Sequence, residues 1–380
     1  MTTLAASGDK QLISAIVEEI NGSRDRLIPF HRFMELCLYH PQFGYYMKEN
    51  PKIGTEGDFY TSASIGTLMG EMLAVAFAQY WRGQQELSVY AITEWGGGTG
   101  RLAEQVMDEL QLSFPDIYAK LQYTIVDTSP YHRDLQSKLA QKHNGVLITV
   151  QSPEAWFAAA ALPDGAIVFA NELLDAFAVH RLQYRNGQFH DGYVGFDTAQ
   201  GAFYEELIPV VPNGELARAL DQRKLAARMQ EGQWIEWNPM ASAWIAQIAN
   251  KLTDGLLVLI DYGEEEEQLY APSRMNGTLL CYFRHQAHDN PYVNIGQQDI
   301  TAHVDFTACM EAGVAAGLQV ETFETQQKFL IRLGIIERLQ AHTESDPFHP
   351  IVKRNRAIRQ LLLGDSMADV FKVVSLTKRR

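Results

Sequence analysis

Residues 89–110 read VYAITEWGGGTGRLAEQVMDEL, and this stretch decides the fold. A short apolar run leads into four glycines at 96, 97, 98 and 100, and apolar residues at helical spacing follow. The pattern predicts a strand, a side-chain-free turn and a helix, so that backbone N–H groups can approach a ligand at the helix N-terminus. A tight connection without any ligand is the alternative interpretation of the same glycines.

The stretch belongs to a longer alternation of short apolar runs with amphipathic segments. The runs are VYAIT, YTIV, VLITV, AIVFA and LLVLI, starting at residues 89, 123, 146, 166 and 256. Buried apolar runs that alternate with helical segments are typical of a parallel sheet with crossover helices. The sequence therefore predicts an α/β fold.

We expect four segments around this sheet. Residues 1–84 form a helical N-terminal cap that contains the sequence GDFYTS, and 85–178 form the first part of the core. Residues 179–250 form an inserted α+β subdomain that begins with a hairpin at Asn186 and Gly187, because Asn-Gly favours a two-residue hairpin turn. Residues 251–380 complete the core and include a lid-like loop at 263–302, whose acidic run at 264–267 is expected to be a solvated face.

The overall composition excludes several classes of protein. The 46 acidic and 32 basic residues give a formal charge of -14, which disfavours nucleic acid and anionic membranes as partners and suits a basic one. No run of eighteen apolar residues occurs, so a membrane span is not expected. Three cysteines without CxxC spacing predict neither disulfides nor a metal site, and a cytoplasmic location is the default expectation.

Acid or amide side chains stand where four of the apolar runs end. They are Glu94, Asp127, Asn171 with Glu172, and Asp261. The carboxyl ends of parallel strands line one crevice, where α/β proteins bind ligands, so we expect these side chains to lie close together. Any single one could instead cap the helix that follows it.

The ligand that suits this crevice is a nucleoside without phosphates. Gly96, Gly98 and Gly100 depart from the dinucleotide spacing G-x-G-x-x-G, and Glu94 just before them would repel a diphosphate. Its charge suits an ammonium or sulfonium group, and Asp127 is placed to accept the ribose hydroxyls. The sequence therefore favours S-adenosylmethionine over NAD.

Several stretches taken together resemble the MidA-like methyltransferases, whose mitochondrial members are arginine methyltransferases that assist assembly of respiratory complex I. The resemblance runs over residues 29–339 and is carried by HPQFGYY, GTEGDFYTS, EWGGGTG, VDTSPYHRDLQSKL, ANELLDAFAV, LIDYGEEEEQLY, GTLLCYFRH and GQQDITAHVDF. It implies a seven-stranded, Rossmann-like class I methyltransferase core with a helical N-terminal addition. It further implies S-adenosylmethionine as cofactor and an arginine-bearing protein as acceptor, with a respiratory-chain subunit as one candidate.

The candidate site residues follow from these patterns. Glu172 and Asp175 are the catalytic candidates, since paired carboxylates can orient a guanidinium by bidentate hydrogen bonds. Carboxylates in a first helical turn can also simply complement the helix dipole. His303 is a secondary candidate, more often a structural group in such a setting, and no metal is needed. The cofactor-binding candidates are Thr61, Ser62, Glu94, Gly96, Gly98, Gly100, Asp127, Thr128 and Asn171.

Two further functions stay open at this point. One is methylation of a small molecule. The other is an assembly or scaffold protein that binds the donor without transferring methyl groups, because Ala63 and Ser64 stand where the similar family has Pro-Glu after GDFxTS. Self-association as a homodimer is also left open.

Overall fold

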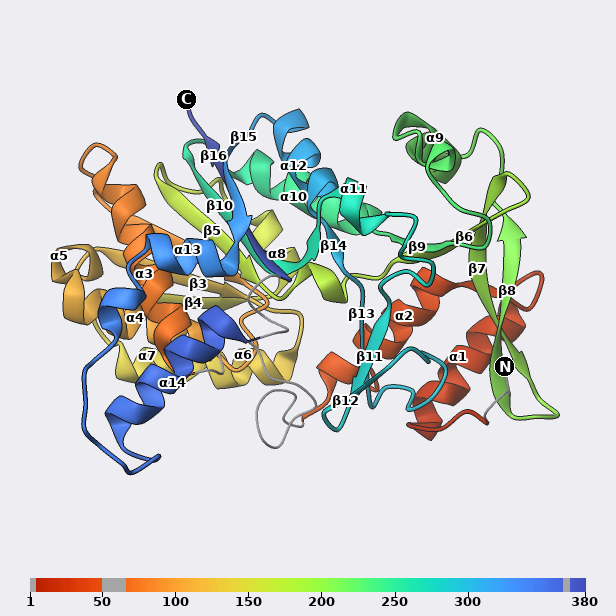
Figure 1. Ribbon diagram of the computed structural model, residues 1–380, viewed down its shortest axis with the longest axis horizontal. Coiled ribbons are helices and arrows are strands. Elements are labelled where there is room, and N and C mark those ends of the chain that lie inside the picture. Colours follow the sequence, from red (N-terminus) through yellow and green to blue (C-terminus); the bar gives the residue numbers. More distant parts are fainter. Residues whose placement is uncertain (1–4, 50–65, 365–369) are drawn as a thin grey trace.

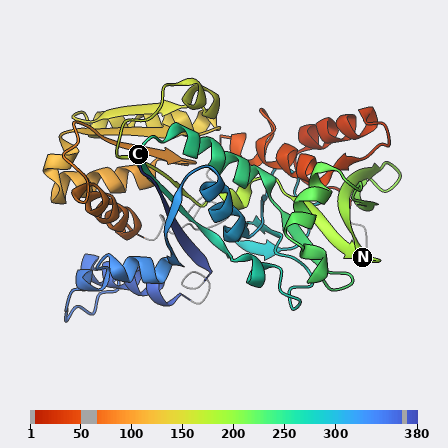
Figure 2. The same ribbon diagram turned by 90° about the horizontal axis from the view of Figure 1, so that it is seen from above.

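The computed structural model describes residues 5–49, 66–364 and 370–380, and they form two lobes side by side (Figure 1). The view from above shows the same two lobes (Figure 2). One lobe is built on a mixed sheet covered by helices on both faces, and the other on small antiparallel sheets with two N-terminal helices. The predicted α/β class is confirmed.

The main sheet has the strand order β15-β16-β10-β5-β2-β3-β4. The five strands from β10 to the edge strand β4 are parallel, whereas β16 is antiparallel to both of its neighbours, β10 and β15. The strands are β2 (Tyr90–Trp95), β3 (Leu121–Val126), β4 (Leu147–Gln151), β5 (Ala166–Asn171), β10 (Gly255–Glu264), β15 (Gln319–Thr325) and β16 (Phe371–Lys378).

An eighth strand distinguishes this sheet from the expected core of seven. The two-residue strand β14 (Val304–Asp305) pairs in parallel with the end of β10, off the path of the other seven. Gly263 faces Val304 in this pair, and a Cβ at 263 would lie 2.1 Å from the carbonyl oxygen of Val304. The extra pairing depends on that close approach, which alternation of apolar residues does not predict.

Helices bury both faces of the main sheet because side chains of neighbouring strand positions point to opposite faces. One face, with Phe169 and Val258, packs on α3 (Leu68–Arg82), α4 (Arg101–Ser113), α5 (Pro115–Tyr118), α13 (Gln326–Arg332) and α14 (Pro350–Leu363). The other face, with Val168 and Leu259, packs on α8 (Pro153–Ala158), α10 (Pro239–Lys251) and α12 (Phe306–Ala315). Short connecting elements are α6 (Pro130–Ser137), α7 (Leu139–Lys142), η3 (Leu174–Ala176), α11 (Glu266–Leu269) and η5 (Ile336–Arg338).

The second lobe combines segments that are far apart in the chain. A five-stranded sheet holds β1 (Ile28–Pro29), β6 (His180–Arg185), β7 (Gln188–Asp197), β8 (Ala202–Pro209) and β9 (Trp234–Trp237). A three-stranded sheet holds β11 (Leu280–Phe283), β12 (Gln286–His288) and β13 (Asp299–Thr301). Helical elements of this lobe are α1 (Lys10–Gly22), α2 (Phe30–Tyr39), η1 (Tyr45–Met47), α9 (Glu215–Gln222) and η4 (Leu225–Ala227).

The hairpin expected at Asn186 and Gly187 is confirmed, since β6 and β7 pair on either side of these residues and both have positive φ. Residues 263–302, expected as a lid-like loop, instead hold α11 and the three-stranded sheet. Nor is their acidic run fully solvated, because Glu266 pairs with Arg223 and Arg228 and is largely buried. The boundaries at 84, 178 and 250 stay predictions.

Candidate active site

The glycine turn between β2 and α4 is a cradle of bare backbone. Gly96, Gly98 and Gly100 have φ values of 69°, 52° and 80°, a region that glycine enters without strain. A Cβ on Gly96 would lie 2.9 Å from Cδ1 of Leu173, and one on Gly97 would lie 2.5 Å from Cγ2 of Ile125. Close packing alone thus accounts for part of the glycine pattern. The turn still opens α4, whose first N–H groups have no helical partner.

Glu94 lies at the end of β2, just before this cradle, and is buried. The hydroxyl of Tyr123 donates a 2.7 Å hydrogen bond to its Oε2. Burial raises the pKa of Glu94 to about 8, against the hydrogen bond from Tyr123, which lowers it. The carboxyl is therefore largely neutral at pH 7, whereas its residue type alone suggests a fixed negative charge.

Asp127 holds the cradle in place. Its Oδ2 accepts hydrogen bonds from the backbone N–H of Gly98 at 3.1 Å and from Nε2 of Gln136 at 3.0 Å. Its Oδ1 accepts the N–H of Ser129 at 2.9 Å. A carboxylate offers about four acceptor positions, so these three bonds leave little capacity for a ribose. The exposed Thr128 next to it accepts from Arg133 through its carbonyl oxygen at 2.8 Å.

The turn after β5 presents Asn171, Glu172 and Asp175. Glu172 has a φ of 53°, a left-handed conformation that costs a non-glycine residue roughly 1 kcal/mol. Oε1 of Glu172 accepts a hydrogen bond from Nδ2 of Asn171 at 3.1 Å. The backbone N–H of Glu172 donates to the carbonyl oxygen of Ile260 at 2.8 Å. Such strain is concentrated at functional sites, and here it falls on a predicted catalytic residue.

Asp261, the acid at the end of the fifth apolar run, binds backbone N–H groups of the protein itself. Its Oδ2 accepts the backbone N–H groups of Leu173, Leu174 and Asp175 at 3.1, 2.9 and 3.3 Å. Burial, followed by the charges of Asp175 and Glu172, raises the pKa of Asp261 well above its usual value. Asp261 does not cap the next helix along the chain, α11, and instead fixes the turn that carries Glu172 and Asp175.

Asp175 is buried beneath this turn, and the hydroxyl of Tyr262 donates to its Oδ2. Its Oδ1 is buried with no hydrogen-bond partner within the described ranges. Burial raises the pKa of Asp175 to about 6, and the hydrogen bond from Tyr262 opposes the shift. The side chain is therefore mostly ionised at neutral pH and has one acceptor oxygen to offer.

The second lobe forms the wall opposite this turn. The hydroxyl of Tyr39 donates to the carbonyl oxygen of Ala176 at 3.0 Å, and that of Tyr46 donates to Oδ1 of Asp299 at 2.8 Å. Burial, and then the charges of Asp175, Asp299 and Glu172, raise the pKa of Tyr282. The carboxylates of both lobes thus meet around one tyrosine.

Sequence reasoning missed several of these residues as site components. Tyr46, Tyr262 and Asp299 each stand in a stretch that carries the family resemblance, but the sequence patterns assign no role to any of them. For Tyr262 a signal existed, since it directly follows the strand-end acid Asp261. For Asp299 there was none, because its place depends on the packing of one lobe against the other.

Two candidates need separate comment. Thr61 and Ser62 lie outside the described residues. His303 is mostly buried, and its ring lies 5.5 Å from that of Tyr262 with their planes at 75°. Burial lowers the pKa of His303 to about 4, so it is neutral at pH 7. Among the residues with assigned positions, no group of three or more His, Cys, Asp or Glu could hold a metal ion, and no helix is long and apolar enough to cross a membrane.

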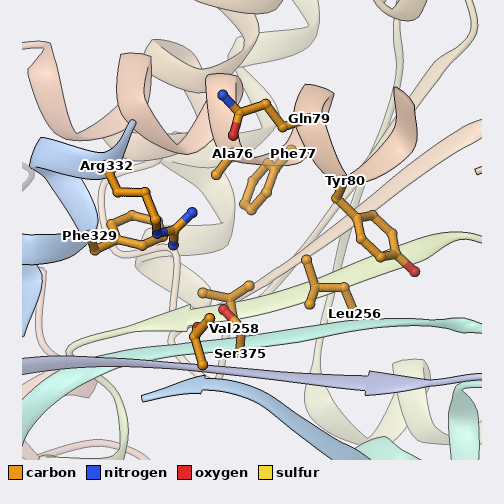
Figure 3. Close-up of a pocket in the computed structure, with 10 residues that line it drawn as sticks. Ala76, Phe77, Gln79, Tyr80, Leu256, Val258, Phe329, Arg332 and Ser375 are labelled. Carbon is orange, nitrogen blue, oxygen red and sulfur yellow. The ribbon is translucent and has the colours of Figure 1, made fainter. Parts of the chain in front are cut away.

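A separate pocket of about 280 Å³ lies between α3 and the β10 and β16 strands (Figure 3). Phe77, Tyr80 and Leu256 line it, with Arg332 at its side. None of the predicted site residues belongs to its lining. It is therefore distinct from the cradle and from the turn after β5.

Residues 72–324 match the family of putative S-adenosyl-L-methionine-dependent methyltransferases. The match spans more than half of the chain, and the protein belongs to this family. A crystal structure from Burkholderia thailandensis, bound to S-adenosylhomocysteine, is similar with a TM-score of 0.85 at 30% identity. The similarity covers 99% of this chain and 95% of that chain.

Two curated relatives are similar over most of this chain. The protein arginine methyltransferase NDUFAF7 homolog of Drosophila melanogaster is 26% identical over 73% of this chain and 65% of its own length. The mouse protein arginine methyltransferase NDUFAF7 is 26% identical over 81% of this chain and 71% of its own length. The chain thus spans about two thirds of the length of these relatives.

These names contradict the prediction of a cytoplasmic location, because the curated relatives are named mitochondrial. The prediction rested on the absence of a long apolar run and on three cysteines that predict no disulfide. Neither property identifies the compartment that receives the protein.

The cofactor is S-adenosylmethionine, and the residues in this structure fit it. A cradle that Cβ atoms would fill leaves backbone free to approach a nucleoside, and the adjoining carboxyl of Glu94 can meet an ammonium group. Gly96, Gly98 and Gly100 with Glu94 would hold it, and Asp127 would hold the glycine turn in place.

Proposed function

We propose that this protein transfers a methyl group from S-adenosylmethionine to a nitrogen of an arginine side chain on a partner protein. The observation that carries the proposal is the pair Glu172 and Asp175. Glu172 has a strained backbone conformation, and Oδ1 of Asp175 is buried without a hydrogen-bond partner among the described residues. Both lie in the turn after β5, the strand that neighbours β2 and its glycine cradle.

The donor supplies a methyl carbon bonded to a positively charged sulfur. What remains for the protein is to orient the acceptor, exclude water and take up the proton that the nitrogen loses. Glu172 and Asp175 can bind a guanidinium through charge-assisted hydrogen bonds. Asp175, with its pKa near 6, is suited to accept the proton and pass it to solvent near neutral pH.

Two further observations support arginine as the acceptor. The curated relatives are named protein arginine methyltransferases. The formal charge of -14 also favours a basic partner over an acidic one. A respiratory-chain subunit, implied by the family resemblance, is one candidate acceptor.

The test is transfer of radiolabelled methyl groups into a cell extract from a strain that lacks this gene, where acceptor sites are unmethylated. We expect label in protein, recovered as methylarginine after acid hydrolysis. Label confined to small molecules would show a different acceptor class. Calorimetric binding of S-adenosylhomocysteine without any transferred label would show a binding protein without catalysis. Light scattering of the purified protein tests self-association.

A further inference from the structure

Tyr262 joins the two strands that form the candidate active site. It follows Asp261 in β10, and its hydroxyl donates to Oδ2 of Asp175 in the turn after β5. Its ring is held on two sides, with the rings of His303 and Phe371 each 5.5 Å away in edge-on contacts. The hydroxyl is therefore fixed in position before any acceptor arrives.

We propose that Tyr262 is a positioning residue for methyl transfer, which holds one oxygen of Asp175 so that Oδ1 receives an N–H group of the acceptor. The inference rests on the proposed function and extends it to the acceptor's chemistry. A buried acceptor oxygen without a partner is destabilising, and a donor on the substrate removes that cost. Guanidinium and amine nitrogens carry such donors, whereas a carboxylate acceptor does not.

Three hydrogen bonds restrain Asp175 together. Oδ2 of Asp261 accepts the backbone N–H of Asp175 at 3.3 Å, which fixes the backbone, and Tyr262 fixes the side chain. The N–H of Ala302 in the second lobe donates to the carbonyl oxygen of Asp175 at 3.0 Å. The orientation of Oδ1 is therefore set by β10 and by the second lobe, which leaves a substrate little reorganisation to drive.

The proton balance of the step assigns each group a role. A C–N bond forms to the guanidinium, the C–S bond breaks with its electron pair remaining on sulfur, and one N–H proton passes to Asp175. Tyr262 keeps its own proton, because burial and then the charges of Asp175 and Asp261 raise its pKa well above the usual value. It can therefore donate to the carboxylate throughout the working pH range.

The surroundings of Asp175 are otherwise acidic or neutral. The titratable groups that face it from the neighbouring elements are Glu172, Asp261, Asp299, Tyr39, Tyr46, Tyr262, Tyr282 and, through contact with Tyr262, His303. None of these groups is a lysine or arginine, and Arg274 and Lys372 act on His303, whose pKa their charges lower. A cationic acceptor would place a positive charge directly beside Asp175.

The experiment compares Tyr262→Phe with Tyr270→Phe. Tyr270 is a matched control because its hydroxyl donates to Oδ2 of Asp305 at 3.3 Å, and the pKa of Asp305 is also raised to about 6, by burial. The probes are a Gly-Arg-Gly peptide and its citrulline analogue, titrated into the protein saturated with S-adenosylhomocysteine. Calorimetry from pH 5 to pH 8 gives the affinity and its pH midpoint.

We expect the wild type and Tyr270→Phe to bind the arginine peptide more tightly than the citrulline peptide. The pH dependence of their affinity for the arginine peptide should have a midpoint near pH 6. Because the Tyr262 hydrogen bond lowers the pKa of Asp175, its loss raises that pKa. Tyr262→Phe should move the midpoint upward by about one unit and weaken arginine-peptide binding about fivefold at pH 6. Affinity for S-adenosylhomocysteine should not change. Asp175→Asn, which keeps Tyr262, should remove the midpoint and so provides a second measurement should Tyr262→Phe not fold.

Equal midpoints in the wild type and Tyr262→Phe would overturn the inference, as would equal binding of the two peptides or a midpoint that persists in Asp175→Asn. These outcomes are separate from the test of the proposed function. Preference for the arginine peptide without methyl transfer into any extract would remove the proposed function and leave the binding role of Asp175 standing. Methyl transfer into protein, together with a binding midpoint in Tyr262→Phe equal to that of the wild type, would support the proposed function and remove the positioning role of Tyr262.

Discussion

The hydroxyl of Tyr123 on β3 lies 2.7 Å from Oε2 of Glu94 on the neighbouring parallel strand β2, and both side chains are buried. Burial raises the pKa of Glu94 to about 8, and the charge of Asp127 adds to the rise. The carboxyl of Glu94, which adjoins the glycine cradle, is therefore largely protonated at neutral pH. At this pH it becomes fully charged when a bound cation makes ionisation favourable.

Donor-site binding should therefore release a proton. The ammonium group of S-adenosylhomocysteine favours ionised Glu94, so affinity should rise with pH by up to about tenfold per unit and level off above pH 8. Calorimetry in buffers of different ionisation enthalpy measures the released proton directly. Tyr123→Phe removes a bond that lowers the pKa of Glu94 and should move the plateau to higher pH. Binding without proton release at pH 7 would contradict this role for Glu94.

Glu172→Gln should separate catalysis from donor binding. The substitution keeps the shape of the side chain but removes the charge that orients a guanidinium, so we expect kcat to fall at least about a hundredfold. The dissociation constant of S-adenosylhomocysteine should stay within about twofold, because the cradle is untouched. Glu154→Gln, an exposed position on α8, is the control and should behave as wild type. Retained turnover would remove Glu172 from the mechanism.

Gly96→Ala should weaken both the fold and the donor site. Its φ of 69° costs alanine about 1–2 kcal/mol, and the new Cβ would press on Cδ1 of Leu173, beside Glu172. Gly187→Ala is the matched control, because Gly187 has a φ of 77° but a Cβ there would meet nothing within 4 Å. Urea unfolding should show similar losses for both. Calorimetry should show weaker S-adenosylhomocysteine binding only for Gly96→Ala.

Glu71 on α3 should contribute a pH-dependent part of the stability. It accepts from Arg354 at 2.8 and 2.6 Å and from Arg338 at 2.8 Å. Burial raises its pKa, but the hydrogen bonds from Arg354 and Thr67 outweigh burial and leave the pKa below its usual value. Because the folded-state pKa is the lower one, this stabilisation is present above about pH 4.5 and is lost as the pH falls.

The corresponding measurement is the free energy of unfolding in urea at pH 7 and pH 4. Glu71→Gln should cost about 1–3 kcal/mol at pH 7 and less at pH 4, where the wild type has begun to lose the same interaction. Glu344→Gln, at an exposed position between the two arginines that bind Glu71, should change neither value. An equal cost at both pH values would mean that the charge of Glu71 does not matter.

The local part of the architecture was predictable from sequence. Strand, glycine turn and helix at 89–110 follow from apolar spacing, and the hairpin follows from Asn186 and Gly187. The meeting of Glu172, Asp175 and Asp261 follows from parallel strands ending at one edge. The first two features depend on residues within one element and its immediate connections, and the third on the common direction of parallel strands.

What sequence could not supply depends on contacts between distant segments. The acid Glu266 looked like part of a solvated run, yet Arg223 and Arg228 of another segment pair with it. Residue type does not predict that Glu94 is largely neutral, because its raised pKa follows from burial. Nor does it predict that Asp261 binds backbone N–H groups, because these belong to the turn after the neighbouring strand. Charge state in a buried site is a property of the packed structure.

In the second lobe, segments near the N-terminus form hydrogen bonds with segments close to residue 295, and this long separation in sequence affects how the protein folds during synthesis. The N–H of Asp9 donates to the carbonyl oxygen of Ile295, and Lys48 donates to that of Gly296. At about 5–20 residues per second, a ribosome needs tens of seconds between these positions. During that interval the nascent helices at the N-terminus have no completed surface to pack against, so newly made chains should depend on chaperones that shield them until synthesis passes residue 302.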